Sequence, residues 1–283
     1  MSTGLRPYSL LTMGVNKLTI IPNMENEKYH LEPSLSASGA KTIAMKSLAH
    51  YKYSEPKTSQ AFDLGTATHT LCLEPHRSNT VWCGPETRRG KAWSERKEEA
   101  EAAGAILLTE AEYKQANEMA KAVWANEEAA KILSGDIMIE PSIFVKDHVR
   151  NVDLRCRPDA WRKDIAAIID LKTTIDPSPA GFASQAGKLG YHIQDQFYRM
   201  CLALEGHEID RFVFIAVDKN GPPYTVGVYE LDERSLREGR AAVEYALDRY
   251  VWAQKTGVWP YDYGELQTIQ IPPYTFKFTE EQN

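Results

Sequence analysis

Residues 157–172 read RPDAWRKDIAAIIDLK, and they combine a strongly apolar run with a small group of charges. The apolar part predicts a buried β-strand. Because side chains alternate along a strand, Asp170 and Lys172 face the same side of the sheet. If the segment before this strand pairs with it as a hairpin, Asp159 lies across from Asp170 on that side. A buried strand has little reason to hold opposite charges on one face unless they form a site.

These charges have two interpretations. Converging carboxylates repel each other unless a cation lies between them, and oxygen ligands favour Mg²⁺, with Mn²⁺ as the alternative. A lysine beside such an ion, here Lys172, steadies or deprotonates an attacking water and offsets charge on a phosphate. In the structural interpretation, Asp159 and Asp170 are turn or edge residues and Lys172 is their ion-pair partner. The residue pattern alone leaves both interpretations open.

The rest of the chain predicts a mixed α/β fold with a central β-sheet flanked by helices. One or two short helices are expected over 34–51, and further helical segments over 61–74, 92–103, 109–134, 191–205 and 230–255. Strands are expected over 137–147, 152–162, 165–174, 211–217 and 224–229, the first three as a meander. The third and fourth of these strands flank a helix, which predicts a βαβ unit with parallel strands.

The domain organisation follows from these elements. Residues 1–28 are expected to be weakly ordered, and residues 29–283 to form one domain. Within that domain, 29–135 is a mainly helical N-terminal extension, 136–255 is the α/β core and 256–283 is a tail. We find no internal repeat and no low-complexity linker in the sequence.

Composition excludes several classes of protein. The net charge of −6 argues against nonspecific coating of DNA, although it leaves a local site open. The cysteines lack a C-x-x-C pair, which argues against a disulfide scaffold or a zinc ribbon, and Cys156 and Cys201 are expected in the core. No stretch approaches the ~20 apolar residues of a membrane span. We therefore expect a cytoplasmic protein with no membrane partner.

Several motifs together resemble a known family. Pro158-Asp159, followed by Asp170-Leu171-Lys172, resembles the PD-(D/E)xK nuclease motif. The sequence GTATH at 65–69 resembles the G-x-x-x-H segment of the exonuclease subgroup, and QDQFY at 194–198 resembles its Q-x-x-x-Y helix. Further segments are similar to phage and prophage exodeoxyribonuclease VIII proteins, namely 29–30, 36–39, 73–75 and 88–93. The resemblance covers residues 28–275 and implies a restriction-endonuclease-like core.

The resemblance also implies roles for single residues. The catalytic residues would be Asp159, Asp170, Lys172, Gln194 and Tyr198, the last two lying on one helical face beside the DNA strand. The metal would be held or bordered by Asp159, Asp170, the Leu171 carbonyl, His69 and Glu140. Phosphate-binding candidates are Arg88, Arg89, Lys91, Arg155 and Arg157. Each peripheral residue also has a structural alternative, such as a core histidine or an arginine paired with a local acid.

The function implied by the resemblance is that of a Mg²⁺-dependent exonuclease. It would degrade one strand of duplex DNA from the 5′ end by a metal-activated water, in phage-type homologous recombination within the bacterial host cell. Its partners would be duplex DNA ends, a homo-oligomeric ring (trimer or tetramer) that encloses DNA, and a single-strand-annealing protein. A ring would confine positive potential to its channel, which reconciles DNA binding with an acidic protein.

Two alternatives remain open. The chain could be a catalytically silent DNA-binding or scaffold module on the same fold. It could also be another PD-(D/E)xK nuclease, such as an endonuclease or an enzyme like those of CRISPR adaptation. We expect no iron–sulfur cluster, because such a cluster needs four cysteines and only Cys201 follows Asp170. The sequence has no P-loop motif, so an ATP-driven motor is excluded.

Overall fold

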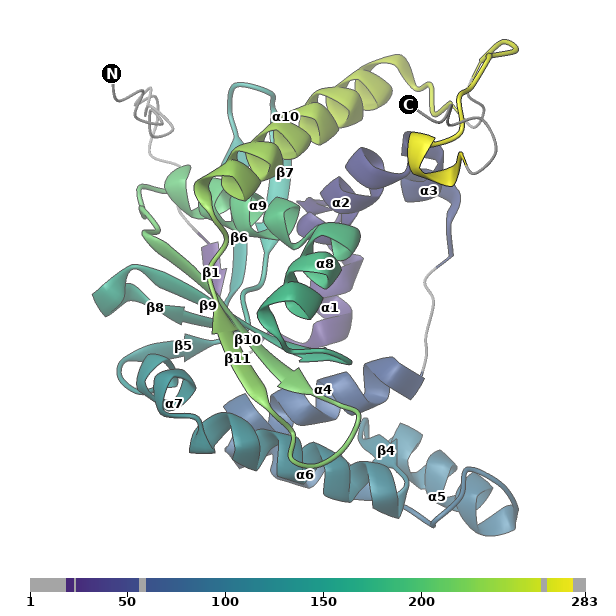
Figure 1. Cartoon of the computed structure of the whole chain (residues 1–283), viewed down its shortest axis with the longest axis vertical. Helices are drawn as coiled ribbons and strands as arrows, with labels where there is room; N and C mark the ends of the chain where they lie inside the picture. Colours follow the sequence, from purple (N-terminus) through teal and green to yellow (C-terminus); the bar gives the residue numbers. More distant parts are fainter. Residues whose placement is uncertain (1–18, 23, 56–59, 261–263, 277–283) are drawn as a thin grey trace, which may run out of the picture.

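The computed structural model describes residues 19–22, 24–55, 60–260 and 264–276 (Figure 1). Its helices are α1 (Asn26–Leu31), α2 (Ala37–Met45), α3 (Leu48–Tyr53), α4 (Gln60–Leu73), α5 (Lys91–Ala102), α6 (Glu110–Ala125), α7 (Glu127–Leu133), α8 (Pro179–Leu189), α9 (Tyr191–Ala203) and α10 (Glu233–Thr256). Its strands are β1 (Thr19–Ile21), β2 (Leu35–Ser36), β3 (Val81–Cys83), β4 (Ile106–Leu108), β5 (Ile137–Ile139), β6 (Ser142–Asp147), β7 (Val152–Cys156), β8 (Ala160–Arg162), β9 (Ala167–Thr174), β10 (Arg211–Asp218) and β11 (Val226–Tyr229). Short 3₁₀ turns follow at Pro75–Thr80, Lys163–Ile165 and Pro273–Thr275.

The central sheet has the strand order β11-β10-β9-β8-β5. Strands β9 and β10 are parallel, with Asp170 opposite Phe214, and the other pairs are antiparallel. The parallel pair confirms the expected βαβ unit, in which both α8 and α9 lie between the strands. The helix at 179–189 was not predicted from the sequence. The mixed α/β architecture is as expected.

The expected meander is wrong in one respect, because its first two strands are each divided between two sheets. Glu140 adopts a left-handed backbone (φ 44°) before Pro141, and Pro158 interrupts the next segment. Proline lacks the N–H that a central strand needs, so pairing stops at both places. Consequently β5 and β8 join the central sheet, whereas β6 and β7 join a second sheet of order β1-β6-β7-β2.

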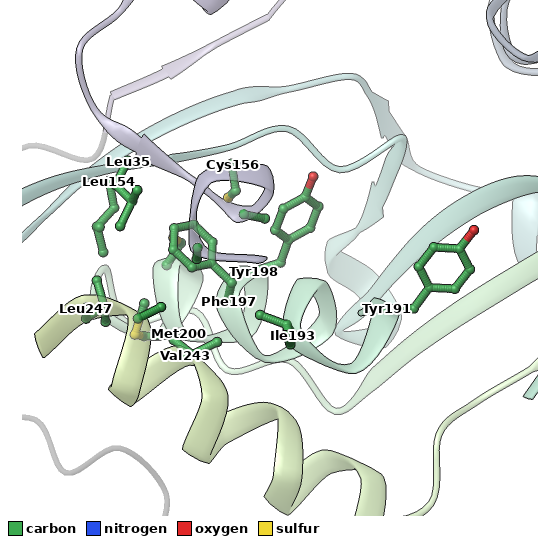
Figure 2. Packing of buried hydrophobic residues seen from close by; sticks show 14 of the residues in the cluster. Leu35, Leu154, Cys156, Tyr191, Ile193, Phe197, Tyr198, Met200, Val243 and Leu247 are labelled. Carbon is green, nitrogen blue, oxygen red and sulfur yellow. The ribbon is translucent and has the colours of Figure 1, made fainter. Parts of the chain in front are cut away.

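Helices cover both faces of the central sheet (Figure 1). One face packs on α4, α6 and α7 through a core that includes Ile169, Leu171 and Val213. The opposite face packs on α2, α8, α9 and α10 through a core that includes Phe212 and Phe214. Figure 2 shows the part of this second core where α9 meets α10. Strand β9 is therefore enclosed on both sides.

The structure also bears on the predicted helices, the core cysteines and the N-terminal segment. The expected helices are present, although 34–51 and 109–134 are each two helices, and Cys156 and Cys201 are buried. Residues 19–21, expected to be weakly ordered, form β1 on the second sheet, and residues 1–18 lie outside the described part. The short strands β1 to β4 have two or three residues each, too few for a period to be recognised. No helix among the described residues is both long and apolar enough to cross a membrane.

The contact between α10 and α9 yields the first testable prediction. A Cβ added at Gly239 would collide with the backbone carbonyl of His192, whose carbon lies 2.7 Å away, and backbone cannot rotate aside. We expect Gly239→Ala to lower the free energy of unfolding by about 2 kcal/mol or more, measured by urea denaturation. Gly187→Ala in α8 is the matched control, because nothing lies within 4 Å of its added Cβ. That helical substitution should be neutral or stabilising by up to about 1 kcal/mol. Equal stability of the two variants would contradict the packing described here.

Candidate active site

Asp159 lies where the chain passes from the second sheet into the central one. Its carboxylate oxygen Oδ2 accepts a hydrogen bond from the backbone N–H of Leu171 at 2.7 Å. Strand β8 pairs with β9 only as far as Ala160 and Ile169, so this N–H has no β8 partner. The N–H and C=O of one strand residue point to the same edge, so the Leu171 carbonyl also faces Asp159. The structure thus brings together two of the three oxygen sources that the resemblance implies.

Asp170 supplies the third. It is 1% exposed, on the face of β9 that packs against α9. Its carboxylate forms an ion pair with Lys172 and accepts a hydrogen bond from Gln194 Nε2 at 2.6 Å. Gln194 Oε1 in turn accepts a hydrogen bond from Lys172 Nζ at 3.4 Å. A single amide from α9 therefore orients both charged groups of the strand.

His69 completes the contacts of Asp159. Its Nδ1 lies 3.3 Å from Asp159 Oδ2, and α4 carries it to the edge of the central sheet. Glu140 approaches the same residue through its backbone, since its N–H donates to the Asp159 carbonyl at 3.0 Å. Both residues that the resemblance places near a metal therefore adjoin Asp159 in the structure. Their roles as ligands stay predictions.

Burial governs the electrostatics of the site. Burial raises the pKa of Asp159 to about 6, with a further upward contribution from Asp170, while His69 and Lys172 act in the opposite direction. Burial alone would lower the pKa of Lys172, but the adjacent carboxylates of Asp170 and Asp159 raise it above its ordinary value. Lys172 is consequently an ammonium at neutral pH. The pKa of Glu140 is also raised, first by burial and then by Glu74.

The donor set suits a divalent cation that prefers oxygen ligands. Asp170 Oδ2 is buried and, apart from its ion pair with Lys172, accepts no hydrogen bond. No three His, Cys, Asp or Glu residues of the described chain converge closely enough to hold a metal by themselves. A cation here would therefore take Asp159, Asp170 and the Leu171 carbonyl, and complete its shell with water or phosphate oxygens. Mg²⁺ binds proteins in this way.

Tyr198 has a structural contact in addition to its predicted role. It lies one turn after Gln194 on α9, is buried, and donates its hydroxyl hydrogen to the Arg157 carbonyl at 3.0 Å. Burial raises the pKa of this hydroxyl well above its ordinary value, so the donor is retained. The bond holds the residues directly before Asp159. Contact of Tyr198 with DNA stays a prediction.

The arginines proposed for phosphate binding already have partners within the chain. Both Arg155 and Arg157 stack on Tyr29, at 5.1 and 4.1 Å from its ring centroid. Arg155 also donates to the Glu32 carbonyl, and Arg157 donates to Ser142 Oγ at 2.7 Å. These contacts tie the segment around α1 to the second sheet. Neither arginine forms an ion pair with an acid among the described residues, and a phosphate-binding role for the two stays a prediction.

The second group of predicted phosphate contacts lies around α5. Arg88 forms ion pairs with Asp63 at 3.4 Å and Glu112 at 2.9 Å, and its guanidinium lies 5.2 Å from the Trp93 ring centroid. Lys91 pairs with Glu95 at 3.4 Å, and both Lys91 and the neighbouring Arg89 are exposed. Among the described residues, none of these contacts reaches the acids of the site. A phosphate-binding role for this group stays a prediction.

Three residues at the site were not assigned from the sequence: Lys41, Glu74 and Tyr191. Glu74 is 5% exposed, accepts hydrogen bonds from Arg77 on both carboxylate oxygens, and adds to the charge around Glu140. Tyr191 begins α9, and its ring centroid lies 4.9 Å from Lys172 Nζ. Lys41 is the one cation in α2, whose other residues are small or apolar. This contrast in the sequence could have identified Lys41 as a candidate.

The comparisons with known proteins agree with this fold. The sequence model of the family described as a PDDEXK-like domain of unknown function (DUF3799) matches residues 34–272. A solved structure named as a putative exonuclease from Eubacterium rectale is similar with a TM-score of 0.58 and 17% identity, over 83% of this chain and 87% of that chain. At this identity the likeness shows the fold.

A phage related exonuclease from Haemophilus somnus 129PT matches at 13% identity, over 82% of this chain and 100% of that chain. Its TM-score is 0.35, which is too low to carry an argument. No curated protein matches the chain.

The raised pKa of Asp159 predicts how the metal-free protein responds to pH. Between pH 3.8 and about 6 the folded state binds more protons than the unfolded state, so stability falls as the pH rises through that window. Asp159→Asn removes the charge and keeps an oxygen for the Leu171 N–H. We expect the variant to be more stable than wild type above pH about 7, by about 1–3 kcal/mol, and the difference to vanish toward pH about 4. Urea denaturation in the presence of a chelator measures both values. A difference that does not change with pH would contradict the burial of a charged Asp159.

Proposed function

The chain belongs to the PDDEXK-like family, and from this premise we propose that it is a Mg²⁺-dependent exonuclease that degrades duplex DNA from the 5′ end. The observation that carries the proposal is the convergence of Asp159, Asp170 and Lys172 on β9, at the point where its neighbour β8 ends. The amide of Gln194 supports it further, because this one side chain hydrogen-bonds both Asp170 and Lys172 and so fixes their relative orientation. A catalytically silent scaffold has no reason to keep this arrangement at a buried position.

The chemistry divides between the cation and the protein. When bound by Asp159, Asp170 and the Leu171 carbonyl, a divalent cation supplies Lewis acidity toward water and phosphate. Lys172, protonated at neutral pH, holds its proton at Nζ and donates toward the negative charge that develops on the phosphate. In this proposal Lys172 acts as an electrostatic group.

The remaining residues orient this group. Gln194 hydrogen-bonds both Asp170 and Lys172, and His69 contacts Oδ2 of Asp159, the oxygen that also accepts the Leu171 N–H. Such supporting hydrogen bonds fix the ligand geometry before the substrate arrives, which lowers the cost of reaching the transition state. Tyr198 does the same for the backbone before Asp159.

The finer parts of the proposal concern the substrate and the assembly. We propose that the substrate is the end of a DNA duplex, that the protein forms a trimeric or tetrameric ring, and that it acts in phage-type recombination with a single-strand-annealing protein. The support is the resemblance of the motifs to exodeoxyribonuclease VIII proteins. A ring would also reconcile the net charge of −6 with DNA binding, because it confines positive potential to its channel.

A direct test of this proposal is Mg²⁺-dependent digestion of a linear duplex, with the label at either the 5′ or the 3′ end. We expect wild type to release the 5′ label first, and a chelator to stop the reaction. Lys172→Met should lower the rate by about 10²–10³-fold, because the ammonium that faces the phosphate is lost. Lys188→Met is the matched control, since this exposed lysine lies in the last turn of α8 and should leave the rate unchanged.

Other outcomes would identify the alternatives. Cleavage of a closed circular duplex at a comparable rate would indicate an endonuclease. Binding of the duplex without any cleavage would indicate a scaffold module. Equal rates for wild type and Lys172→Met would remove the site assignment.

A further prediction concerns the orienting amide of Gln194. Gln194→Met keeps the volume of the side chain but removes both hydrogen bonds to the charged pair. We expect a loss of about 10–100-fold in activity at limiting Mg²⁺, and a higher Mg²⁺ concentration at half-maximal rate. Mg²⁺ titrations of the initial rate, with thermal unfolding to verify the fold, measure this. An unchanged Mg²⁺ requirement would contradict a role for Gln194 in orienting the ligands.

A further inference from the structure

Lys41 brings a second ammonium group to the proposed site, from an element outside the α/β core. Its Nζ lies 6.0 Å from the centroid of the Tyr191 ring, and Lys172 Nζ lies 4.9 Å from the same centroid. Tyr191 is buried at the start of α9, and its hydroxyl accepts a hydrogen bond from Gln185 at 3.1 Å. The aromatic ring therefore has a defined orientation, and both ammonium groups are placed relative to it.

The aliphatic part of Lys41 is held in position as well. A Cβ added at Gly190 would lie 3.2 Å from Lys41 Cδ and 2.6 Å from Met45 Sδ. The lysine stem thus runs directly over the backbone where α8 gives way to α9. Gly190 has φ 67°, so a side chain is disfavoured there on conformational grounds too. This close approach fixes the direction in which the ammonium leaves α2.

Lys41 has no anionic partner among the residues that the structure describes. It forms neither an ion pair nor a side-chain hydrogen bond there, whereas Lys28, Lys91 and Lys121 each pair with a nearby glutamate. Burial lowers the pKa of Lys41 to about 8, and the neighbouring charge of Lys172 lowers it further than Asp170 restores it. A half-buried cation without a counterion is costly, and an anion bound beside it would remove that cost.

We propose that Lys41 binds a backbone phosphate of the DNA strand being cleaved, next to the phosphate held at Asp170 and Lys172. The inference rests on the proposed nuclease function and adds a substrate contact to it. Successive phosphates of one strand advance about 3.4 Å along the helix axis, so a strand bound at the acids presents a neighbouring phosphate nearby. A contact of this kind fixes the register of the strand without reading its sequence.

The test compares Lys41→Met, which keeps the length of the side chain, with Lys41→Arg, which keeps the charge. Lys46→Met is the matched control, because this exposed lysine follows α2 directly. Binding of a labelled linear duplex is measured in a chelator over a series of salt concentrations. We expect Lys41→Met to reduce the slope of log Kd against log salt by about one, and the other two variants to keep the wild-type slope.

A modified substrate separates a direct contact from a structural effect. In a set of duplexes, one phosphate at a time near the 5′ end is replaced by an uncharged methylphosphonate. At one position we expect the replacement to weaken binding by wild type and by Lys46→Met, but not to weaken binding by Lys41→Met any further. A purely structural role of Lys41 would leave every replacement with the same effect on all variants.

The outcomes distinguish the two proposals. If wild type cleaves duplex DNA with Mg²⁺ but Lys41→Met keeps the full salt slope and responds to every methylphosphonate as wild type does, only the role of Lys41 is overturned. If wild type neither binds nor cleaves duplex DNA, the proposed function fails and takes this inference with it. Unfolding of Lys41→Met would show in its thermal transition. Lys41→Gln, which also removes the charge, then takes its place: loss of sensitivity to one methylphosphonate supports the contact, and the wild-type response at every position overturns it.

Discussion

The placement of a carboxylate on a strand enclosed on both faces is the constraint on which the rest of the structure depends. Asp170 lies in β9, between two hydrophobic cores, and a buried charge without partners would destabilise the fold. Lys172 from the same strand and Gln194 from α9 meet that requirement. The first turn of α9 must therefore lie over β9, so that Gln194 reaches Asp170. The packing of α9 against α10 keeps it in this position.

The second constraint is the division of two chain segments between two sheets. Pro158 ends the pairing of β7, and the chain enters β8 one residue after Asp159. Since β8 is short, β9 extends beyond it, and the Leu171 N–H is free to bind a side chain. A continuous meander would have paired this group with a neighbouring strand and left the carboxylate elsewhere. The break between β7 and β8 therefore leaves the end of β9 without a β8 partner, and the acids converge at this unpaired part of β9.

The N-terminal helical extension contributes more than a cover for the core. The ring of Tyr29 from α1 contacts Arg155 in β7 and Arg157 just after it, which ties the extension to the segment that leads into Asp159. Helix α2 packs on α9 and α10 and carries Lys41 to the ring of Tyr191. Elements more than one hundred residues apart in sequence thus supply groups to one edge of the sheet.

The sequence by itself determined the α/β class, the positions of most helices and the pair formed by Asp170 and Lys172, because these follow from local periodicity and strand alternation. The prolines at 141 and 158 mark the strand breaks in the sequence, but long-range pairing decides which sheet each of the resulting strands joins. Only the tertiary structure decided that Arg155 and Arg157 stack on Tyr29, that Arg88 binds two carboxylates, and that Lys41 reaches the site. A side chain's partners come from whichever element packs against it, and no local pattern encodes that choice.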